Sequence, residues 1–405
     1  MKVAFLSPHF PAEMPEFTRG LAEVGAQVVG VGDVPLAGIP ESVRRHIAHY
    51  VQVPRLLDAQ STLQVAAPAL ARLGVERVEC LWEVGVEIAA SLRQALALPG
   101  QNPADALAFR DKSVMKARLA AAGLRVPRNA RVRDLAQAQA AAEAIGYPLI
   151  VKPIDGAGSA STYRVDNASE LERAIRMCGH LSEVGVEEFI SGEEFTYDTV
   201  CLNGVPAFDS IAQYHPKPLE ARSQEWISPG QIVLRDPHSA GLDDAVRFGR
   251  AVLTAMGMGT GFTHMEWYRT AAGEIVFGEI AARAPGGRLV DQMNYANDFD
   301  VYREWARAVC WGTFEAVAHR RYHVACVFKR AHGQGRIRRV EGLERVRSKM
   351  GAWLVAEDLL PLGSPRRDWK QTLLSDGCLL ARHPDYDTCR RMMEMLVQDV
   401  QVYAG

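Results

Sequence analysis

Apolar runs and segments of helical spacing alternate along the first hundred residues. They follow one another in the order 2–7, 16–25, 27–31, 78–82 and 87–98. Short apolar runs are typical of buried strands, and apolar positions three or four residues apart are typical of helices. Because strands that alternate with helices form parallel sheets, this order predicts a doubly wound α/β domain over residues 1–100, which Pro99-Gly100 ends.

The rest of the chain mixes strands and helices less regularly. Helical spacing covers residues 105–122, 134–145, 169–177 and 243–256. Strand-like segments cover residues 149–153, 163–165, 184–190, 196–202, 207–213, 262–269 and 274–280. The last part offers strands at 324–330, 353–357 and 377–381 and a helix at 385–400. We predict a central region over residues 101–310 and a C-terminal α+β lobe over residues 311–405, so the fold class combines α/β with α+β.

The composition makes some classes of partner and location less expected than others. Apolar residues make up 48% of the 405 residues, and the formal charge of −2 gives no reason to expect nucleic acid as a partner. Only four apolar residues precede Pro8 after one charge, too few for a signal peptide or a membrane span. The seven cysteines lack a CxxC pair, which predicts buried thiols. We expect a cytoplasmic protein that binds small molecules and neither nucleic acid nor membrane.

A lysine at the end of a predicted strand precedes a loop of small residues. Lys152 is followed by Asp155-Gly156-Ala157-Gly158-Ser159-Ala160-Ser161, and only eight of the 46 basic residues are lysine. An ammonium group beside free backbone N–H groups can hold a polyphosphate. The alternative is an ordinary strand connection with a surface lysine. The loop is no Walker motif, because no GK[ST] follows, and the turn at residues 7–11 lacks the GxGxxG of a dinucleotide site.

Two predicted strands, 262–268 and 276–283, form a hairpin that carries two glutamates. Period-2 alternation puts His264 and Glu266 on one face, and the turn near Ala271–Gly273 brings Glu266 opposite Gly278 or Glu279. Two facing carboxylates repel each other unless a cation bridges them, and carboxylate oxygens suit Mg²⁺. The alternative is that one glutamate faces solvent.

Two further segments flank this hairpin. Arg283 and the run Pro285-Gly286-Gly287-Arg288 follow it, offering guanidinium groups and close backbone approach to an anionic substrate. Residues 186–195 alternate acidic and apolar positions around a Ser-Gly turn, which by itself could be an exposed strand. Its position between the lysine loop and the hairpin favours a role in the same site.

In this order the motifs resemble those of the ATP-grasp superfamily, specifically its carboxylate–amine ligase branch, which contains bacterial L-amino acid ligases. The resemblance covers residues 98–300 and includes Arg110–Lys116 followed by Gly123–Pro127. It implies an ATP-grasp fold between an N-terminal α/β domain and a C-terminal lobe. It also implies an enzyme that uses ATP with Mg²⁺, for which Mn²⁺ can substitute.

The resemblance assigns roles to matching residues. In the family, two lysines contact the phosphates, a small-residue lid (here 156–161) covers them, one segment (here 187–190) meets adenine, and a carboxylate binds the ribose. The implied ATP-binding positions are Lys112, Lys152, Gly156, Gly158, Ser159, Ser161, Glu187, Glu188, Phe189, Ile190 and Glu194. The implied metal ligands are Glu266 and Glu279.

The implied reaction phosphorylates a carboxylate, expected to be an amino acid, and an amine, expected to be a second amino acid, attacks the acylphosphate to give an amide, ADP and phosphate. Arg283 and His264 are the expected catalytic residues, with the alternative that His264 is only packed in its strand. Gly286, Gly287 and Arg288 are the expected substrate-binding residues. The resemblance leaves open whether the protein forms a homodimer.

One position departs from the family pattern. The family writes its last motif E-x-N-x-R, with asparagine as a third metal ligand, and this chain has Ala281 there. Because of Ala281, a nucleotide-binding module without turnover stays open as an alternative. Within the same chemistry, an enzyme like biotin carboxylase that phosphorylates bicarbonate is a second alternative. ATP-grasp ligases of nucleotide biosynthesis are a further possibility.

Overall fold

The N-terminal domain is a doubly wound parallel sheet, as predicted. The structure, a computed structural model, describes residues 1–154, 161–372 and 374–405. The sheet has the order β3-β2-β1-β4, and its strand pairs are parallel. The strands are β1 (Lys2–Leu6), β2 (Gln27–Gly32), β3 (Ile47–Gln52) and β4 (Arg77–Glu79). The helices are α1 (Met14–Glu23), α2 (Glu41–Arg44), α3 (Ala59–Leu73) and α4 (Val86–Ala95).

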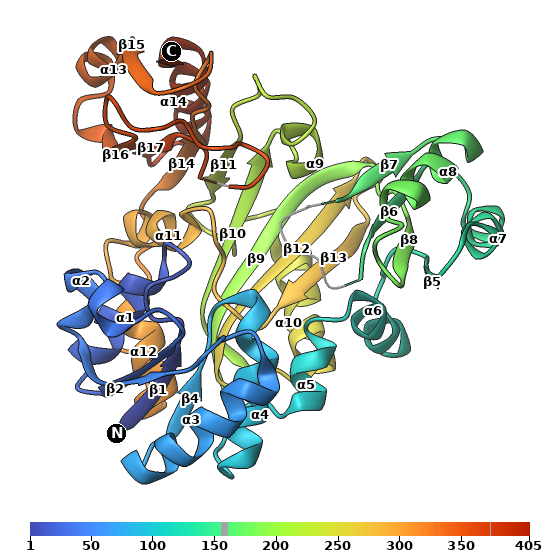
Figure 1. The fold of residues 1–405 in the computed structure, drawn as a ribbon. Coiled ribbons are helices and arrows are strands. Elements are labelled where there is room, and N and C mark those ends of the chain that lie inside the picture. The colour runs from blue at the N-terminus through green and yellow to red at the C-terminus, as the bar shows by residue number, and fades with distance from the viewer. Residues whose placement is uncertain (155–160, 373) are drawn as a thin grey trace.

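Alternate residues of β1 enter two different cores, which explains why the strand is apolar throughout. Val3 and Phe5 pack with Phe17 of α1 and Trp305 of α12 (Val301–Trp311). Ala4 and Leu6 face the other side, among residues of α3 and α4. A parallel sheet covered on both faces needs such continuous apolar strands. Through α12, this domain is joined to the rest of the molecule by one hydrophobic core (Figure 1).

The prediction of a single helix over residues 105–122 is wrong. The chain forms α5 (Pro103–Ala108) and α6 (Lys112–Ala121), with a break at Asp111. The Asp111 carboxylate accepts hydrogen bonds from the backbone N–H groups of Ser113 and Val114, which is how an aspartate begins a helix. The break places Lys112 at the first position of α6.

A small antiparallel sheet follows, in the order β5-β8-β6-β7. Its strands are β5 (Asn129–Val132), β6 (Leu149–Pro153), β7 (Tyr163–Val165) and β8 (Val184–Glu188). Helices α7 (Leu135–Ile145) and α8 (Ala168–Met177) contribute apolar residues to the core of this sheet. Residues 155–160, which carry most of the predicted phosphate lid, lie outside the described residues.

An eight-stranded antiparallel sheet forms the centre of the molecule (Figure 1). Its order is β13-β12-β9-β10-β11-β14-β17-β16. The strands are β9 (Gly192–Leu202), β10 (Val205–His215), β11 (Gly230–Val233), β12 (Gly261–Thr270), β13 (Ile275–Ala281), β14 (His323–Phe328), β16 (Leu354–Leu359) and β17 (Gly377–His383). The α-helices and strands not yet described are α9 (Pro218–Ala221), α10 (Asp243–Met256), α11 (Leu289–Asn297), α13 (Leu343–Met350), α14 (Tyr386–Asp399), β15 (Ile337–Glu341) and β18 (Gln401–Ala404).

The large sheet crosses the boundary that we propose at residue 310. Strands β14, β17 and β16 belong to the C-terminal lobe, yet β14 pairs with β11 of the central region over four residues. The lobe is therefore built on the same sheet as the glutamate hairpin.

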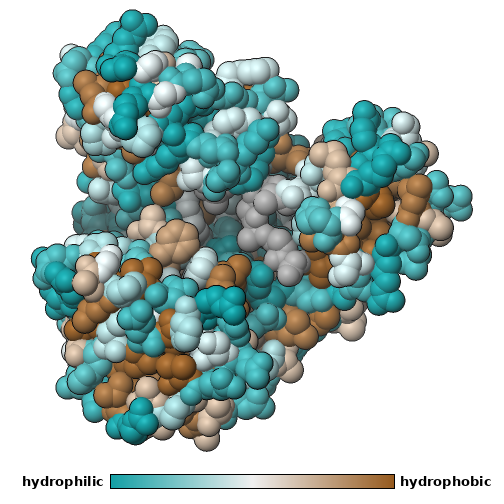
Figure 2. All heavy atoms as spheres, in the orientation of Figure 1, coloured by the Kyte–Doolittle hydropathy of each residue, from teal (hydrophilic) through white to brown (hydrophobic). Residues whose placement is uncertain are grey.

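The seven cysteines are buried and free, as predicted. Among the described residues, no helix has the length and apolar character needed to cross a membrane. Figure 2 shows a hollow in the surface between the N-terminal domain, the C-terminal lobe and the part of the molecule that holds the small sheet.

Candidate active site

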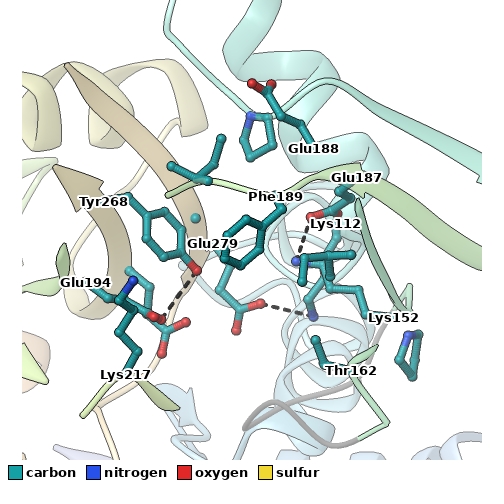
Figure 3. Close-up of a pocket in the computed structure, with 16 residues that line it drawn as sticks. Lys112, Lys152, Thr162, Glu187, Glu188, Phe189, Glu194, Lys217, Tyr268 and Glu279 are labelled. Carbon is teal, nitrogen blue, oxygen red and sulfur yellow. Dashed lines mark hydrogen bonds and ion pairs between the residues drawn. The ribbon is translucent and has the colours of Figure 1, made fainter. Parts of the chain in front are cut away.

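A pocket lies between the small sheet and the glutamate hairpin (Figure 3). It encloses about 820 Å³, adjoining open solvent included. The residues that line it are Lys112, Pro127, Ile150, Lys152, Pro153, Thr162, Glu187, Glu188, Phe189, Ile190, Glu194, Lys217, Glu266, Tyr268, Gly278 and Glu279. The structure therefore brings the two predicted phosphate lysines, the predicted adenine segment, the ribose carboxylate and both predicted metal ligands to one place.

One wall of the pocket is built around lysines, and we call it the lysine wall: Lys112, Lys116, Lys152 and Glu187. The ammonium group of Lys152 lies 2.8 Å from the Glu187 carboxylate, and that of Lys116 lies 2.5 Å from its other oxygen. Burial opposes ionisation of Glu187, but the two lysines outweigh it and lower its pKa to about 2. Burial lowers the pKa of Lys116 to about 8. Lys112 points across the pocket to Glu279, at 3.3 Å.

The two acidic side chains of the predicted adenine segment are both engaged within the protein. Glu187 is held by the lysines, and the Glu188 carboxylate accepts hydrogen bonds from the guanidinium group of Arg125 and from the backbone N–H of Arg128. The third residue of this segment, Phe189, also lines the pocket. The guanidinium carbon of Arg164 lies over its ring, 4.4 Å from the ring centre. A base bound here would therefore meet the aromatic ring of Phe189.

The opposite wall carries three glutamates, and we call it the carboxylate wall: Glu194, Glu266 and Glu279. Glu266 pairs with Glu279 across β12 and β13, one of the two registers that the sequence predicts. The Tyr214 hydroxyl donates a hydrogen bond to Glu266 at 3.2 Å, and the Tyr268 hydroxyl donates one to Glu194 at 3.4 Å. Burial and the charge of Glu266 raise the pKa of Glu194 to about 8. Glu279 is paired with Lys112 and Glu266 lies 3.7 Å from His264, whereas Glu194 has no ion-pair partner among the described residues.

His264 is fixed by a buried carboxylate from the neighbouring strand. Its Nδ1 atom lies 2.5 Å from Asp198, which also accepts a hydrogen bond from the Thr196 hydroxyl at 2.7 Å. Its Nε2 atom lies 3.7 Å from Glu266. Burial lowers the pKa of His264, but Asp198 and Glu266 outweigh this effect and raise it to about 9. His264 also pairs with Ala281 across the hairpin, so a methyl group stands beside the imidazole where the family has an amide.

Arg283 is oriented by the N-terminal domain. Its guanidinium group donates a hydrogen bond to Glu83, which begins the short 3-10 helix η2 (Glu83–Gly85) after β4. Glu83 also accepts a hydrogen bond from Arg110 at 2.6 Å. Burial opposes the ionisation of Glu83, but the two arginines outweigh it and lower its pKa to about 2. Arg283 is thus positioned by an ion pair that joins two domains.

The two facing carboxylates fit a divalent cation. Like charges on directly paired residues are unfavourable without a bridging cation, and hard oxygen ligands suit Mg²⁺. Within the described residues, no group of three or more His, Cys, Asp or Glu side chains is arranged to hold a metal ion. Glu266 and Glu279 would therefore supply two ligands, and the others would come from phosphate oxygens and water.

The predicted substrate residues are not among those that line the pocket. Arg288 precedes α11 with a φ of 61°, and its Nε atom is 3.1 Å from Asp291. Gly286 and Gly287 form the turn before it, and none of the three lines the pocket. Of the predicted lid residues, Gly156, Gly158 and Ser159 lie outside the described residues, and Ser161 is exposed.

The sequence analysis gave no role to several residues that the structure places at this site. They are Glu83, Lys116, Asp198 and Tyr268. A signal existed for Lys116: the chain has only eight lysines, and Lys112, Lys116, Lys152 and Lys217 all lie at or beside the pocket. The contacts of Glu83 and Asp198 join residues far apart in sequence, which no local pattern reveals.

Comparison with known proteins points to the ATP-grasp superfamily, which the sequence motifs also resemble. Residues 145–292 match the ATP-grasp domain family. The fold of the whole chain is that of an L-amino acid ligase from Bacillus licheniformis, with a TM-score of 0.80 and 20% identity over 100% of this chain and 99% of that one. The match over residues 145–292 and the shared fold confirm the predicted resemblance to the ATP-grasp superfamily.

Sequence similarity points to a branch of that superfamily. The chain is 31% identical over 207 residues to the L-arginine-specific L-amino acid ligase of Bacillus subtilis, covering 49% of each protein. It is 23% identical over 274 residues to a formate-dependent phosphoribosylglycinamide formyltransferase of Flavobacterium psychrophilum, covering 64% of this chain and 66% of that protein. The chain thus spans from about half to about two thirds of the length of these relatives. Its similarity lies with the carboxylate–amine ligase branch.

Proposed function

We propose that the protein is an ATP-dependent carboxylate–amine ligase. A carboxylate oxygen of the first substrate attacks the γ-phosphorus of ATP, and ADP leaves. The nitrogen of the second substrate then attacks the carbonyl carbon of the acylphosphate, loses a proton, and phosphate leaves. The relative that is named an L-amino acid ligase supports amino acids as both substrates.

One observation carries this proposal: Lys112, Lys152, Glu266 and Glu279 meet in a single pocket. Phosphoryl transfer needs positioning and neutralisation of charge more than covalent help from the protein. The two lysines offer cations to the phosphates, and Glu194 offers an acceptor to the ribose hydroxyls. Solved neighbours of this fold were determined with ADP or MgADP bound, which supports ATP as the nucleotide.

The other residues of the site would have separate roles in the reaction. Glu266 and Glu279 would hold Mg²⁺, or Mn²⁺ in its place, and the ion would supply positive charge to the transferring phosphoryl group. Arg283, held by Glu83, faces the carboxylate wall and stabilises negative charge on the acyl oxygen. His264 positions Glu266 through Nε2. We place the reaction in the cytoplasm and leave the oligomeric state open.

The test is release of ADP and phosphate from ATP and Mg²⁺ with single and paired amino acids, with bicarbonate alone and with no acceptor. We expect release only with an amino acid pair, and a loss of about 100-fold or more in Lys152→Ala and Glu279→Gln. Lys349→Ala, on the surface of the C-terminal lobe, is the matched control. Release with bicarbonate alone would show the carboxylase reaction instead, and nucleotide binding without release would show a binding module.

A further inference from the structure

The connection between β10 and β11 runs from the nucleotide pocket to the C-terminal lobe. We call it the strap: residues 216–229, which include the short helix α9. Near its start Lys217 lines the pocket, and Figure 3 shows it beside Glu194 and across the pocket from Lys152. Unlike the three lysines of the lysine wall, Lys217 forms no ion pair with a residue that the structure describes. Its ammonium group is therefore available to an anionic ligand of the pocket.

The strap has little regular structure of its own to fix Lys217. Helix α9 has only four residues, and a single helical turn is marginal by itself because its nucleation is unfavourable. Within this turn the backbone N–H of Ala221 donates a hydrogen bond to the carbonyl oxygen of Lys217 at 2.9 Å. The place of Lys217 therefore depends on what holds Ala221.

The C-terminal lobe holds this turn through Arg330, which follows β14 and is only 7% exposed. Its Nη1 atom donates hydrogen bonds to the carbonyl oxygens of Ala221 and Gln224, both at 2.9 Å. Its guanidinium group lies over the ring of Trp369, 4.7 Å from the ring centre. Arg330 is thus fixed by its own lobe and reaches the strap with two donors.

Arg330 differs from the other arginine that joins the strap to this lobe. Arg366 forms an ion pair with Glu225 of the strap and lies 3.6 Å from Asp376. Arg330 has no carboxylate within ion-pair distance among the described residues, although it is buried. A buried cation without a carboxylate is unfavourable, so its hydrogen bonds to the strap carbonyls are the contacts that favour its position.

We propose that Arg330 is a positioning residue for the nucleotide pocket: it fixes the turn of α9 on the C-terminal lobe and thereby fixes the place of the Lys217 ammonium group. Arg330 does not line the pocket, so its effect passes through the strap. The path runs from Arg330 to the carbonyl of Ala221, from the N–H of Ala221 to the carbonyl of Lys217, and along the Lys217 side chain into the pocket. The inference rests on the proposed function in one respect, which is that an anionic nucleotide binds in this pocket.

A double-mutant cycle on the full chain tests this path, with calorimetry of a non-hydrolysable ATP analogue and Mg²⁺ as the measurement. Lys217→Met should weaken binding about tenfold, because it removes a cation from the pocket. Arg330→Met should weaken binding about 3- to 10-fold. The double variant should bind as Lys217→Met does, because residues that act through one another are not additive. Arg336→Met, whose guanidinium group donates to the carbonyl of Gly363 in the same lobe, is the matched control and should keep the wild-type affinity.

The melting temperature separates positioning from stability. Arg330→Met should lower it equally with and without Lys217, because the strap hydrogen bonds are lost in both backgrounds. The effect of Arg330→Met on affinity should appear only where Lys217 is present. Arg330→Lys keeps a cation that can donate to the carbonyls, so its affinity should lie between those of the wild type and Arg330→Met. If Arg330→Met does not fold, the cycle is run with Arg330→Lys, for which we expect about a 2- to 3-fold loss that Lys217→Met abolishes.

The outcomes separate this inference from the proposed function, because the cycle needs no turnover. Losses of affinity that multiply in the double variant, or an unchanged affinity in Arg330→Met, would overturn the positioning role. A Lys217-dependent effect of Arg330→Met without release of ADP with any acceptor would keep the positioning role and reject the ligase. Amino-acid-dependent release of ADP with an unaffected Arg330→Met would keep the ligase and reject the positioning role. A wild type that does not bind the analogue would overturn both.

Discussion

The two walls of the nucleotide pocket balance their charges in opposite ways. On the lysine wall, the buried Glu187 lies between Lys116 and Lys152, and its pKa falls to about 2. On the carboxylate wall, Glu194 lies near Glu266 with no described cation in ion-pair contact, and its pKa rises to about 8. Both glutamates are buried and only seven positions apart. The partner, more than the burial, decides whether the carboxylate is ionised. Glu187 has two lysine partners, whereas Glu194 has no ion-pair partner among the described residues.

Removing one lysine should break the balance of the lysine wall. In Lys116→Met, Glu187 keeps only Lys152 as a partner. We expect the free energy of unfolding to fall by about 3–5 kcal/mol, the usual effect of breaking a buried ion pair. Urea denaturation followed by circular dichroism measures this. Lys349→Met, at the surface, should change stability little. If the free energy of unfolding of Lys116→Met fell by less than about 1 kcal/mol, Lys152 alone would be enough to neutralise Glu187.

The pH dependence of stability should have opposite signs at the two walls. The folded pKa of Glu187 is lowered, so its contribution is present above the unfolded pKa near 4.5 and is lost as the pH falls toward 2. The folded pKa of Glu194 is raised, so its contribution is present below 4.5 and is lost as the pH rises from 4.5 to about 8. Glu194→Gln should therefore gain stability relative to the wild type across this range.

Urea denaturation of the wild type and Glu194→Gln at pH 5, 6, 7 and 8 measures that gain. Adding Mg²⁺ with ADP should reduce it, because a bound cation offsets the charge of Glu266. A difference that stays constant with pH would show that Glu194 keeps one protonation state throughout, contrary to the comparison of the two walls.

The smallest expected effect comes from restoring a ligand to the carboxylate wall. Ala281 pairs with His264 beside the Glu266–Glu279 pair, so Ala281→Asn adds an amide oxygen next to two carboxylates. We expect the Mg²⁺ concentration for half-maximal binding of ADP to fall by about 3- to 10-fold. Ala281→Val adds bulk without a ligand and should not lower it. An equal change in both variants would trace the effect to packing rather than to metal ligation.

Features set by neighbouring residues were predictable from the sequence. The facing of Glu266 and Glu279 follows from strand alternation and a short turn, and the winding of the N-terminal domain follows from its apolar pattern. The break at Asp111 was missed because helical spacing continues through it, while the side chain caps a new helix. The pairing of Glu83 with Arg283 spans 200 positions, so it depends on how the domains pack, which the pattern does not encode.

The continuity of the eight-stranded sheet bears on how the pocket opens. Strands β12 and β13, with Glu266 and Glu279, are connected through five further hydrogen-bonded strands to β16 in the C-terminal lobe. Among the described residues, the sheet that carries Lys152 and Glu187 shares no strand pairing with it. A displacement of the small sheet would therefore break no strand hydrogen bond of the large sheet. The carboxylates would keep their position relative to the C-terminal lobe while their distance from the lysines changed.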